Sequence, residues 1–307
     1  MSKSAIVEVV DLHKNYSNVK AVNGISFEVY EGEIFGITGP NGAGKTSLIE
    51  CIEGLKRFDK GSIRVMGLDP QKDKSKLRKL IGIQLQESRL PSRIKVWEAL
   101  DLFASFYASS ADWRSILKDL GLREKGDSYY ETLSGGQKQR LSIALSLIST
   151  PRILFFDELT TGLDPQARRV MWDMVRKIRN QERSVILVTH FMDEAETLCD
   201  RVAIINKGKL IALDKPTNLV QNSHLPIRIK FSTETNIEKS GILSQIQSTA
   251  RVSQNDNEVL ALIHCEADLF HIIQILITSK VCFRDISIKK PTLEDVYLKS
   301  INSDLDV

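Results

Sequence analysis

One stretch of the chain, Gly39 to Thr46, constrains the fold more than any other. It reads Gly-Pro-Asn-Gly-Ala-Gly-Lys-Thr and lies between an apolar run at 33–38 and an amphipathic run at 46–55. These runs predict a buried strand and a helix, so the stretch is a glycine-rich loop between them. Glycines let such a loop bend until successive N–H groups point inward, beside the positive end of the helix dipole. This context favours a phosphate-binding loop over a chance turn.

The loop supplies the first set of predicted nucleotide contacts. Lys45 places a positive charge at the β and γ phosphates, and Thr46 offers its hydroxyl to Mg²⁺. The predicted cofactor-binding residues of this region are Gly39, Asn41, Gly42, Gly44, Lys45, Thr46 and Ser47. Such a loop alone indicates only that the protein binds a nucleoside triphosphate.

Two carboxylates follow a second apolar run, Ile153 to Phe156, which predicts a strand in the centre of a parallel sheet. A carboxylate at the position of Asp157 can hold Mg²⁺ through water. Glu158 comes next and can polarise the attacking water as a general base. An ordinary acidic strand end is the alternative, but the phosphate loop upstream makes that the weaker interpretation.

A third motif, Leu-Ser-Gly-Gly-Gln at 133–137, lies between those two halves. Ser134, Gly135 and Gly136 precede a helix that is predicted to begin near Gln137. A serine and unhindered N–H groups at a helix start form an anion site. Because the chain already has one phosphate site, a second suits a γ-phosphate that another subunit presents. A plain helix cap with a flexible turn is the alternative.

Four isolated residues complete the candidate site. His190 ends a predicted strand, where a neutral imidazole can contact the γ-phosphate or orient the water. The amide of Gln86 can reach Mg²⁺ or the attacking water, and the ring of Tyr16 can stack on adenine. Asp164 lies in a turn that can touch the partner's site. Singly, each has a simpler interpretation: a structural histidine, a surface glutamine, a half-buried aromatic and a turn aspartate.

Strands alternate with helices over most of the chain, which predicts an α/β core. Residues 76–130 carry mainly helical patterns and form a predicted helical insert. A polar segment at 216–226 predicts a boundary between an N-terminal domain, 1–220, and a C-terminal domain, 226–307. The second domain has the order β-α-β-β-α-β, which predicts a small α+β unit of the ferredoxin-like type.

Composition excludes several classes of protein. The net charge of +3 comes from 42 basic and 39 acidic residues, a balance too even to indicate nucleic-acid binding. No apolar run approaches the roughly 20 residues that cross a bilayer, and no secretory signal is visible. The cysteines lack any Cys-x-x-Cys pair, so buried free thiols in a reducing cytoplasm are expected. They are Cys51, Cys199, Cys265 and Cys282.

Together these motifs resemble the ATPase subunit of ATP-binding cassette (ABC) transporters over about residues 5–220. The matching positions are Tyr16, the Walker A loop Gly39–Thr46, the Q-loop Gln86, the signature Leu133–Gln137, the Walker B strand Ile153–Asp157, Glu158, the D-loop Asp164 and the switch His190. The resemblance implies two such domains that hold two ATP molecules head to tail, each between one Walker A loop and the other subunit's signature. Leu159 departs from the family, which usually has proline there, and predicts a looser turn.

Segments 189–196 and 291–297 resemble the bacterial ABC-2-type export branch. That resemblance implies a P-loop ABC ATPase domain with a C-terminal extension, a separate transmembrane permease and a homodimer of ATPase subunits. ATP and Mg²⁺ are then the cofactors, with a location on the cytoplasmic face of the membrane and no nucleic-acid partner. Physically, the acidic run 193–196 is expected to be a solvated helix face. The alternative function is a soluble ABC ATPase that acts on ribosomes or DNA.

Overall fold

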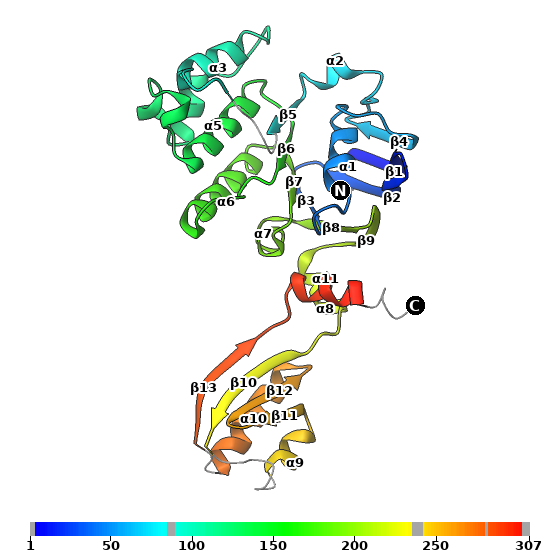
Figure 1. Ribbon diagram of the computed structural model, residues 1–307, viewed down its shortest axis with the longest axis vertical. Helices are drawn as coiled ribbons and strands as arrows, with labels where there is room; N and C mark the ends of the chain where they lie inside the picture. The colour runs from blue at the N-terminus through cyan, green and yellow to red at the C-terminus, as the bar shows by residue number, and fades with distance from the viewer. Residues whose placement is uncertain (1–3, 85–89, 235–241, 280–281, 303–307) are drawn as a thin grey trace. The chain divides into compact units, whose positions relative to one another are not determined.

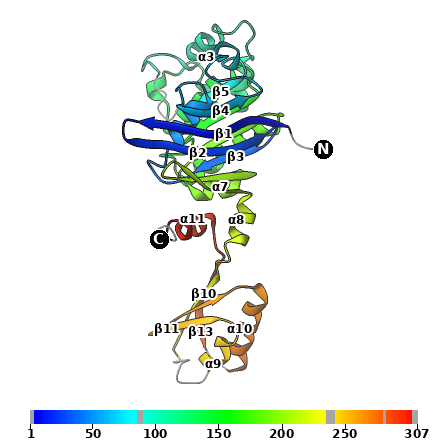
Figure 2. The ribbon, with the colours of Figure 1, turned by 90° about the vertical axis from the view of Figure 1, so that its right-hand side faces the viewer.

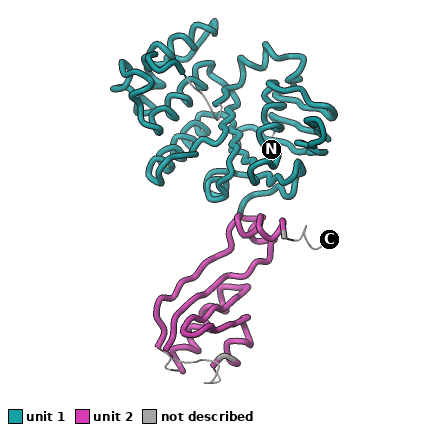
Figure 3. The backbone as a smooth tube through the Cα atoms, in the orientation of Figure 1, with its two compact units in different colours: residues 1–216 teal, residues 217–307 magenta. Residues whose placement is uncertain are grey.

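Two compact units make up the chain, Met1–Pro216 and Thr217–Val307 (Figure 3). The computed structural model describes residues 4–84, 90–234, 242–279 and 282–302. The division between the units falls at the start of the polar segment 216–226. Each unit has its own buried cluster of apolar side chains, so each is described by itself below.

A six-stranded sheet forms the centre of the first unit (Figure 1). Its strands, in spatial order, are β5 (Ile81–Gln84), β6 (Ile153–Asp157), β7 (Ser184–Thr189), β3 (Ile34–Thr38), β8 (Arg201–Asn206) and β9 (Lys209–Asp214). The first five run parallel, and β9 returns antiparallel to β8. Strands β3 and β7 are buried at every position, as expected for a parallel sheet covered on both faces.

A second, antiparallel sheet lies in the same unit and carries the N-terminal segment (Figure 2). It consists of β2 (Val19–Tyr30), β1 (Ala5–Tyr16) and β4 (Lys60–Val65), in that order. Helix α1 (Lys45–Ile52) contributes buried residues to the apolar cluster that these strands share with β3, β6 and β7. This packing fixes the start of α1 relative to the central sheet.

Helices α5 (Gly135–Leu147), α6 (Pro165–Arg179) and α7 (Met192–Leu198) contact strands β5, β7 and β3 of the central sheet. In the predicted insert at 76–130, the regular elements that follow residue 90 are helical, but the beginning of the insert was predicted wrongly, because 81–84 is strand β5. A strand of four residues has little periodicity, and its partner β6 lies far away in sequence. The described elements of the insert are α2 (Lys74–Leu77), α3 (Val96–Ala104), α4 (Trp113–Asp119) and the short turns η1 (Arg123–Lys125) and η2 (Tyr130–Thr132).

The second unit contains a four-stranded antiparallel sheet in the order β11-β12-β10-β13. Its elements are β10 (Ile227–Thr233), α9 (Ile242–Gln247), β11 (Arg251–Asn255), β12 (Glu258–Ile263), α10 (Glu266–Thr278), β13 (Phe283–Lys289) and α11 (Leu293–Asn302). The order along the chain and the sheet order agree with the expected ferredoxin-like arrangement. Alternate residues of β10 and β12 face the core, where Phe231 is 1% exposed.

The polar segment at the boundary begins with helix α8 (Pro216–Asn222), because a proline fits the first turn of a helix. The expectation of buried cysteines was wrong in part. Of the four cysteines, Cys51 and Cys199 are buried, whereas Cys265 and Cys282 are exposed. None of the helices in the described ranges is both long and apolar enough to cross a bilayer.

Replacing Phe231 with Ala should destabilise the second unit by about 3–5 kcal/mol, because truncating a buried phenylalanine leaves a cavity. The matched control is Phe270→Ala, since Phe270 is 72% exposed and its loss should cost about 0.5 kcal/mol or less. Hydrogen exchange of β10 and β12 amides in the full chain measures the difference. Equal effects of the two substitutions would contradict the core assignment.

Candidate functional site

The candidate site begins at one edge of the central sheet. Strands β6, β7 and β3 are neighbours and parallel, so their carboxyl ends meet at the same edge. There β3 leads into the loop 39–46, β6 ends at Asp157 and β7 leads to His190. In open α/β sheets this edge is where ligands bind. The fold therefore gathers three of the predicted motifs, which are distant in sequence.

Backbone packing requires glycine at two positions of the loop 39–46. Gly39 and Gly44 have φ values of 150° and 101°. A Cβ on Gly39 would lie 2.0 Å from the carbonyl oxygen of Ile205, and one on Gly44 would lie 1.9 Å from that of Ala21. Any side chain at either position would therefore push the loop away from its neighbours.

Lys45 is the first residue of α1 and is only 6% exposed. Its ammonium donates to the carbonyl oxygens of Gly39, at 2.9 Å, and Pro40, at 3.0 Å. Burial lowers the pKa of Lys45, and the nearby carboxylates of Glu158 and Asp157 oppose that shift. The phosphate loop and the two carboxylates at the end of β6 thus share one electrostatic environment.

Asp157 lies half-buried at the end of β6. Its pKa is raised to about 6, mainly by burial and also by the charges of Glu158 and Glu50, while Lys45 opposes the rise. Glu53, at the end of α1, is 5% exposed, and burial together with the charges of Asp157 and Glu50 raises its pKa to about 8. Carboxyl groups are therefore crowded at this edge, and a cation would lower the free-energy cost of ionising them.

Glu158 and His190 are in direct contact. The Oε1 atom of Glu158 lies 3.1 Å from Nδ1 of His190. The Glu158 backbone has φ 51°, a left-handed conformation that is uncommon for a non-glycine residue, and its N–H donates to the carbonyl of Val188 at 2.9 Å. Backbone strain of this kind often accompanies functional sites. The arrangement suits a general base held by a second titratable group.

The turn after Glu158 is closed, not loosened as Leu159 led us to expect. Leu159 is fully buried, and the N–H of Thr161 donates to the carbonyl of Glu158 at 3.2 Å. Apolar burial therefore holds this turn in place where a proline would restrict φ. The substitution leaves the contact between Glu158 and His190 in place.

The signature residues lie at the start of α5. This helix begins at Gly135, two residues earlier than expected. The Ser134 hydroxyl accepts from the N–H of Gln137, whose side chain accepts from the N–H of Ser134 at 2.9 Å. These two bonds form a capping box, so the side chain of Gln137 orders the helix start. Ser134 and Gly135 are exposed, so this helix end is open to a ligand from outside the chain.

Asp164 caps α6 in a similar way, because its Oδ1 accepts from the N–H of Ala167 at 2.8 Å. Gly136 and Asp164 line one cavity of about 260 Å³, together with Arg140 and residues of α6. The structure therefore brings the signature and the D-loop side by side. Their predicted contacts with nucleotide across a subunit interface stay predictions.

The remaining predicted residues lie as follows. Asn41 and Thr46 are exposed, and Ser47 is half-buried in the first turn of α1. Tyr16 ends β1 and is 39% exposed. Gln86 lies outside the described residues, so its predicted catalytic and metal-binding roles stay predictions.

Sequence reasoning missed two lysines beside Tyr16. The Nζ atoms of Lys14 and Lys56 lie 5.0 Å and 5.4 Å from the centre of its ring. Both lysines also pair with acids, Lys14 with Asp59 at 3.7 Å and Lys56 with Glu50 at 2.7 Å. Lys14 precedes Tyr16 by two positions on the same strand, a spacing that places both side chains on one face.

Sequence reasoning also missed how the segment after His190 is held. The rings of His190 and Phe191 lie 4.1 Å apart, and the guanidinium of Arg168 lies 4.3 Å from the ring of Phe191. Glu194 is fully buried and accepts from the indole N–H of Trp172 at 3.0 Å, so the expected solvated acidic face was wrong at this position. Burial raises the pKa of Glu194, while neighbouring hydroxyls and that indole oppose the rise.

The side chains present fit Mg²⁺ better than a metal that prefers nitrogen or sulfur. No group of three histidine, cysteine or acidic side chains forms a metal centre within the described residues. Asp157 and Thr46 offer oxygen atoms, and Mg²⁺ is usually held by one or two such ligands plus phosphate oxygens and water. Burial and the neighbouring Glu158 raise the pKa of Asp157, and a bound cation would favour its ionised form.

A phosphate loop, two carboxylates after a buried strand, and a histidine in contact with the second of them define a P-loop nucleoside triphosphatase. Comparison with known proteins gives the particular family. Residues 22–161 match the family model described as ABC transporter. This match and a relative that is 33% identical over the whole chain show that the chain belongs to the ATP-binding cassette family and is an ATPase.

Relatives match over different lengths. The Nod factor export ATP-binding protein I of Rhizobium sp. (strain N33) is 33% identical over 312 residues and covers 100% of both chains. The protein of the same name from Burkholderia orbicola (strain AU 1054) is 37% identical over 223 residues. The matched region is 71% of this chain and 73% of that protein.

Solved structures show the same cassette. The cbiO1 protein from Clostridium perfringens, part of the ABC transporter complex cbiONQ, has a TM-score of 0.64 at 28% identity and covers 71% of this chain and 91% of its own. A dimeric cassette bound to ADP and Pi in a post-hydrolysis state has a TM-score of 0.62 at 24% identity, over 68% and 98% of the two chains. These comparisons confirm the α/β cassette fold.

Replacing Gly44 with Ala should lower ATP affinity by about tenfold or more, because the new Cβ adds a backbone clash to a positive φ. The matched control is Gly67→Ala, since Gly67 also has a positive φ, of 76°, but open space around its Cα. Equilibrium binding of ATP measures the effect. If both variants bind as tightly as the wild type, the close approach does not shape the loop.

Replacing Asp157 with Asn should stabilise the nucleotide-free chain above pH 6 and have little effect near pH 4. Because the folded chain raises the pKa of this carboxyl to about 6, the folded state binds more protons than the unfolded state between its ordinary pKa and pH 6. The free energy of unfolding therefore falls as pH rises through that window. Asparagine does not ionise, so the variant does not lose this stability. Thermal unfolding of both proteins at each pH gives the difference, and a difference independent of pH would contradict the environment described for Asp157.

Proposed function

We propose that the chain is the ATP-hydrolysing subunit of an exporter, which dimerises on binding Mg-ATP and drives a separate membrane subunit. The observation that carries the proposal is the contact of Glu158 with His190, in the electrostatic environment that Glu158 and Asp157 share with Lys45. The names of the relatives support an export function, because both proteins compared above are export ATP-binding proteins.

Hydrolysis follows from these side chains. The N–H groups of the loop 39–46 and the ammonium of Lys45 bind the β and γ phosphates and hold them in line for attack. Mg²⁺, held by Thr46 and Asp157, would neutralise part of the phosphate charge. The carboxylate of Glu158 accepts a proton from the attacking water, and His190 positions that carboxylate through the contact of 3.1 Å. The oxygen of that water bonds to the γ-phosphorus while the bond from this phosphorus to the bridging oxygen breaks, which releases ADP and phosphate.

Dimerisation is supported by the exposed start of α5. Gly135, the first residue of this 13-residue helix, and the N-cap Ser134 are exposed, and the helix dipole favours an anion there. The γ-phosphate on a second copy has the required charge. Asp164 lies beside the same helix start and would then touch the partner's site.

A groove beside the central sheet fits a helix of the membrane subunit. This cavity, of about 380 Å³, lies between β5, the end of α3 and α5, and its lining includes Ile83, Phe103, Tyr107 and Leu145. Next to it Phe106 is 69% exposed. An amphipathic helix docks its apolar face in grooves of this kind. Movement of the helical insert would then be transmitted to the permease. The chain would lie on the cytoplasmic face of the membrane, bound through the permease.

Replacing Glu158 with Gln should lower the rate of ATP hydrolysis by about 10²–10⁴-fold, because the amide cannot accept the proton. ATP affinity should persist, and the nucleotide-bound dimer should accumulate. Phosphate release and light scattering with Mg-ATP measure the two effects.

The matched control is Glu196→Gln, which changes an exposed glutamate on α7 and should leave both properties unchanged. Turnover close to wild type in the Glu158 variant would remove this residue from the mechanism. A particle that stays monomeric with ATP would instead contradict dimerisation. Co-purification with ribosomes or DNA, and not with a multi-span membrane protein, would contradict the transport function.

A further inference from the structure

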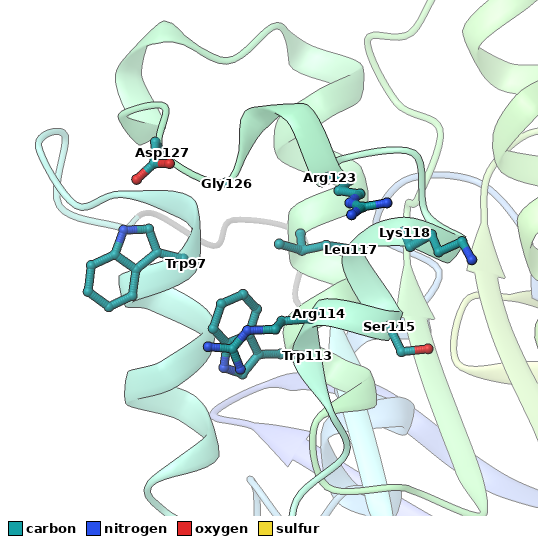
Figure 4. A pocket seen from close by; sticks show the side chains of 9 residues that line it. All are labelled: Trp97, Trp113, Arg114, Ser115, Leu117, Lys118, Arg123, Gly126 and Asp127. Carbon is teal, nitrogen blue, oxygen red and sulfur yellow. The ribbon is translucent and has the colours of Figure 1, made fainter.

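A cavity of about 570 Å³ opens in the helical insert, and none of its lining residues belongs to the predicted nucleotide site (Figure 4). It lies among the start of α3, helix α4 and the turn η1 with the residues that follow it. The lining consists of Trp97, Trp113, Arg114, Ser115, Leu117, Lys118, Arg123, Gly126 and Asp127. Its volume is in the range of small-ligand sites.

Positive charge dominates this lining. Within the described ranges, Arg114, Lys118 and Arg123 form no ion pair with an acid. The one acidic residue of the lining, Asp127, pairs with Lys95 at 3.6 Å. Three uncompensated cations around one cavity favour an anionic ligand. Two of them are guanidinium groups, whose planar N–H donors match the oxygens of a phosphate.

Indole rings form the apolar part of the wall. The guanidinium of Arg114 lies 4.2 Å from the ring of Trp113, so stacking limits its orientation. Trp97 is 36% exposed, and Leu117, at 3%, is the buried apolar residue of the lining. Figure 4 shows Trp97 and the stacked pair toward one side of the cavity and Lys118 toward the other. A ligand that has a short carbon chain beside its anion would contact both kinds of surface, because its C–H groups can lie against the indole rings.

Backbone hydrogen bonds fix two walls of the cavity relative to each other. The N–H of Trp97 donates to the carbonyl of Gly126 at 3.0 Å, and the N–H of Val96 donates to Ser128 at 3.1 Å. The N–H of Tyr130 donates to Ile94 at 2.9 Å. The start of α3 is thereby joined to the segment that leads into the signature. A preformed cavity loses less conformational entropy when it binds a ligand.

We propose that this cavity binds a phosphate ester with a short carbon body, of the glycerol phosphate type. Arg114 and Arg123 would bind the phosphate oxygens, Lys118 would add a third charge, and the indoles would contact the carbon chain. An anionic lipid headgroup and a soluble phosphate ester both have this chemistry. The proposal concerns binding alone and does not depend on the ATPase mechanism or on the permease.

Two arms test the proposal, both with saturating Mg-ADP so that the loop 39–46 is occupied. In the first, the chain is sedimented with phosphatidylcholine vesicles that either contain or lack phosphatidylglycerol. In the second, sn-glycerol 1-phosphate is titrated into the protein and also added as a competitor of the vesicles. The double variant Arg114→Gln/Arg123→Gln should bind about thirtyfold more weakly than the wild type, since two charged contacts are lost.

The matched control is Lys60→Gln/Arg64→Gln, which removes the same charge from exposed positions of β4. Vesicle binding that the cavity variant loses and glycerol phosphate does not compete away identifies a lipid headgroup. Binding of glycerol phosphate with the same dependence identifies a soluble ester. Equal losses in the cavity and control variants, or no binding by the wild type in either arm, would overturn the proposal. Trp97→Ala provides a second variant that weakens binding without a change of charge.

Discussion

The electrostatic environment around Lys45 determines how the rest of the site is built. This ammonium is almost fully buried, and it lies between the carbonyls of its own loop and the field of two carboxylates. A buried cation is tolerated only where such oxygens surround it. The loop carbonyls compensate it only if Gly39 and Gly44 bring the backbone close to its neighbours. The geometry of the loop and the compensation of the Lys45 charge therefore depend on each other. The parallel sheet brings the groups together, because β3, β6 and β7 end at the same edge.

A group of acidic side chains close to one another is the other main feature of this site. Glu50, Glu53, Asp157 and Glu158 act on one another, and the pKa values of Glu53 and Asp157 are raised above their ordinary range. A site built only for stability would not gather acids in this way, because their burial and mutual repulsion both cost free energy. The arrangement becomes favourable when a cation and a polyphosphate enter together. Ligand binding therefore contributes stability that the protein without its ligands lacks.

The sequence predicted the motifs well because each depends on local rules. Glycines, a lysine and a helix start are adjacent at 39–46, and the apolar run before Asp157 predicts a buried strand without knowledge of its partners. Strand β5 and the burial of Glu194 were missed because both depend on contacts distant in sequence, with β6 and with Trp172. Leu159 was misjudged for the same reason, since its effect on the turn comes from the core that surrounds it. The ferredoxin-like order was predictable because alternation along each strand marks the face that the helices cover.

Side chains of helix α6 contact the segment that follows His190, so this helix is connected to the segment that carries the histidine. Arg168 and Trp172 lie on α6, which Asp164 caps, and they hold Phe191 and Glu194 on the segment that follows His190. A change at the D-loop, where a partner subunit would bind, has two routes to the histidine: along α6 to these contacts, and through the turn that joins Asp164 to Glu158. Because Glu194 is fully buried, moving it without Trp172 would leave a polar group unpaired. The helix and the histidine segment are therefore expected to move together, which would link the presence of a second subunit to the position of Glu158.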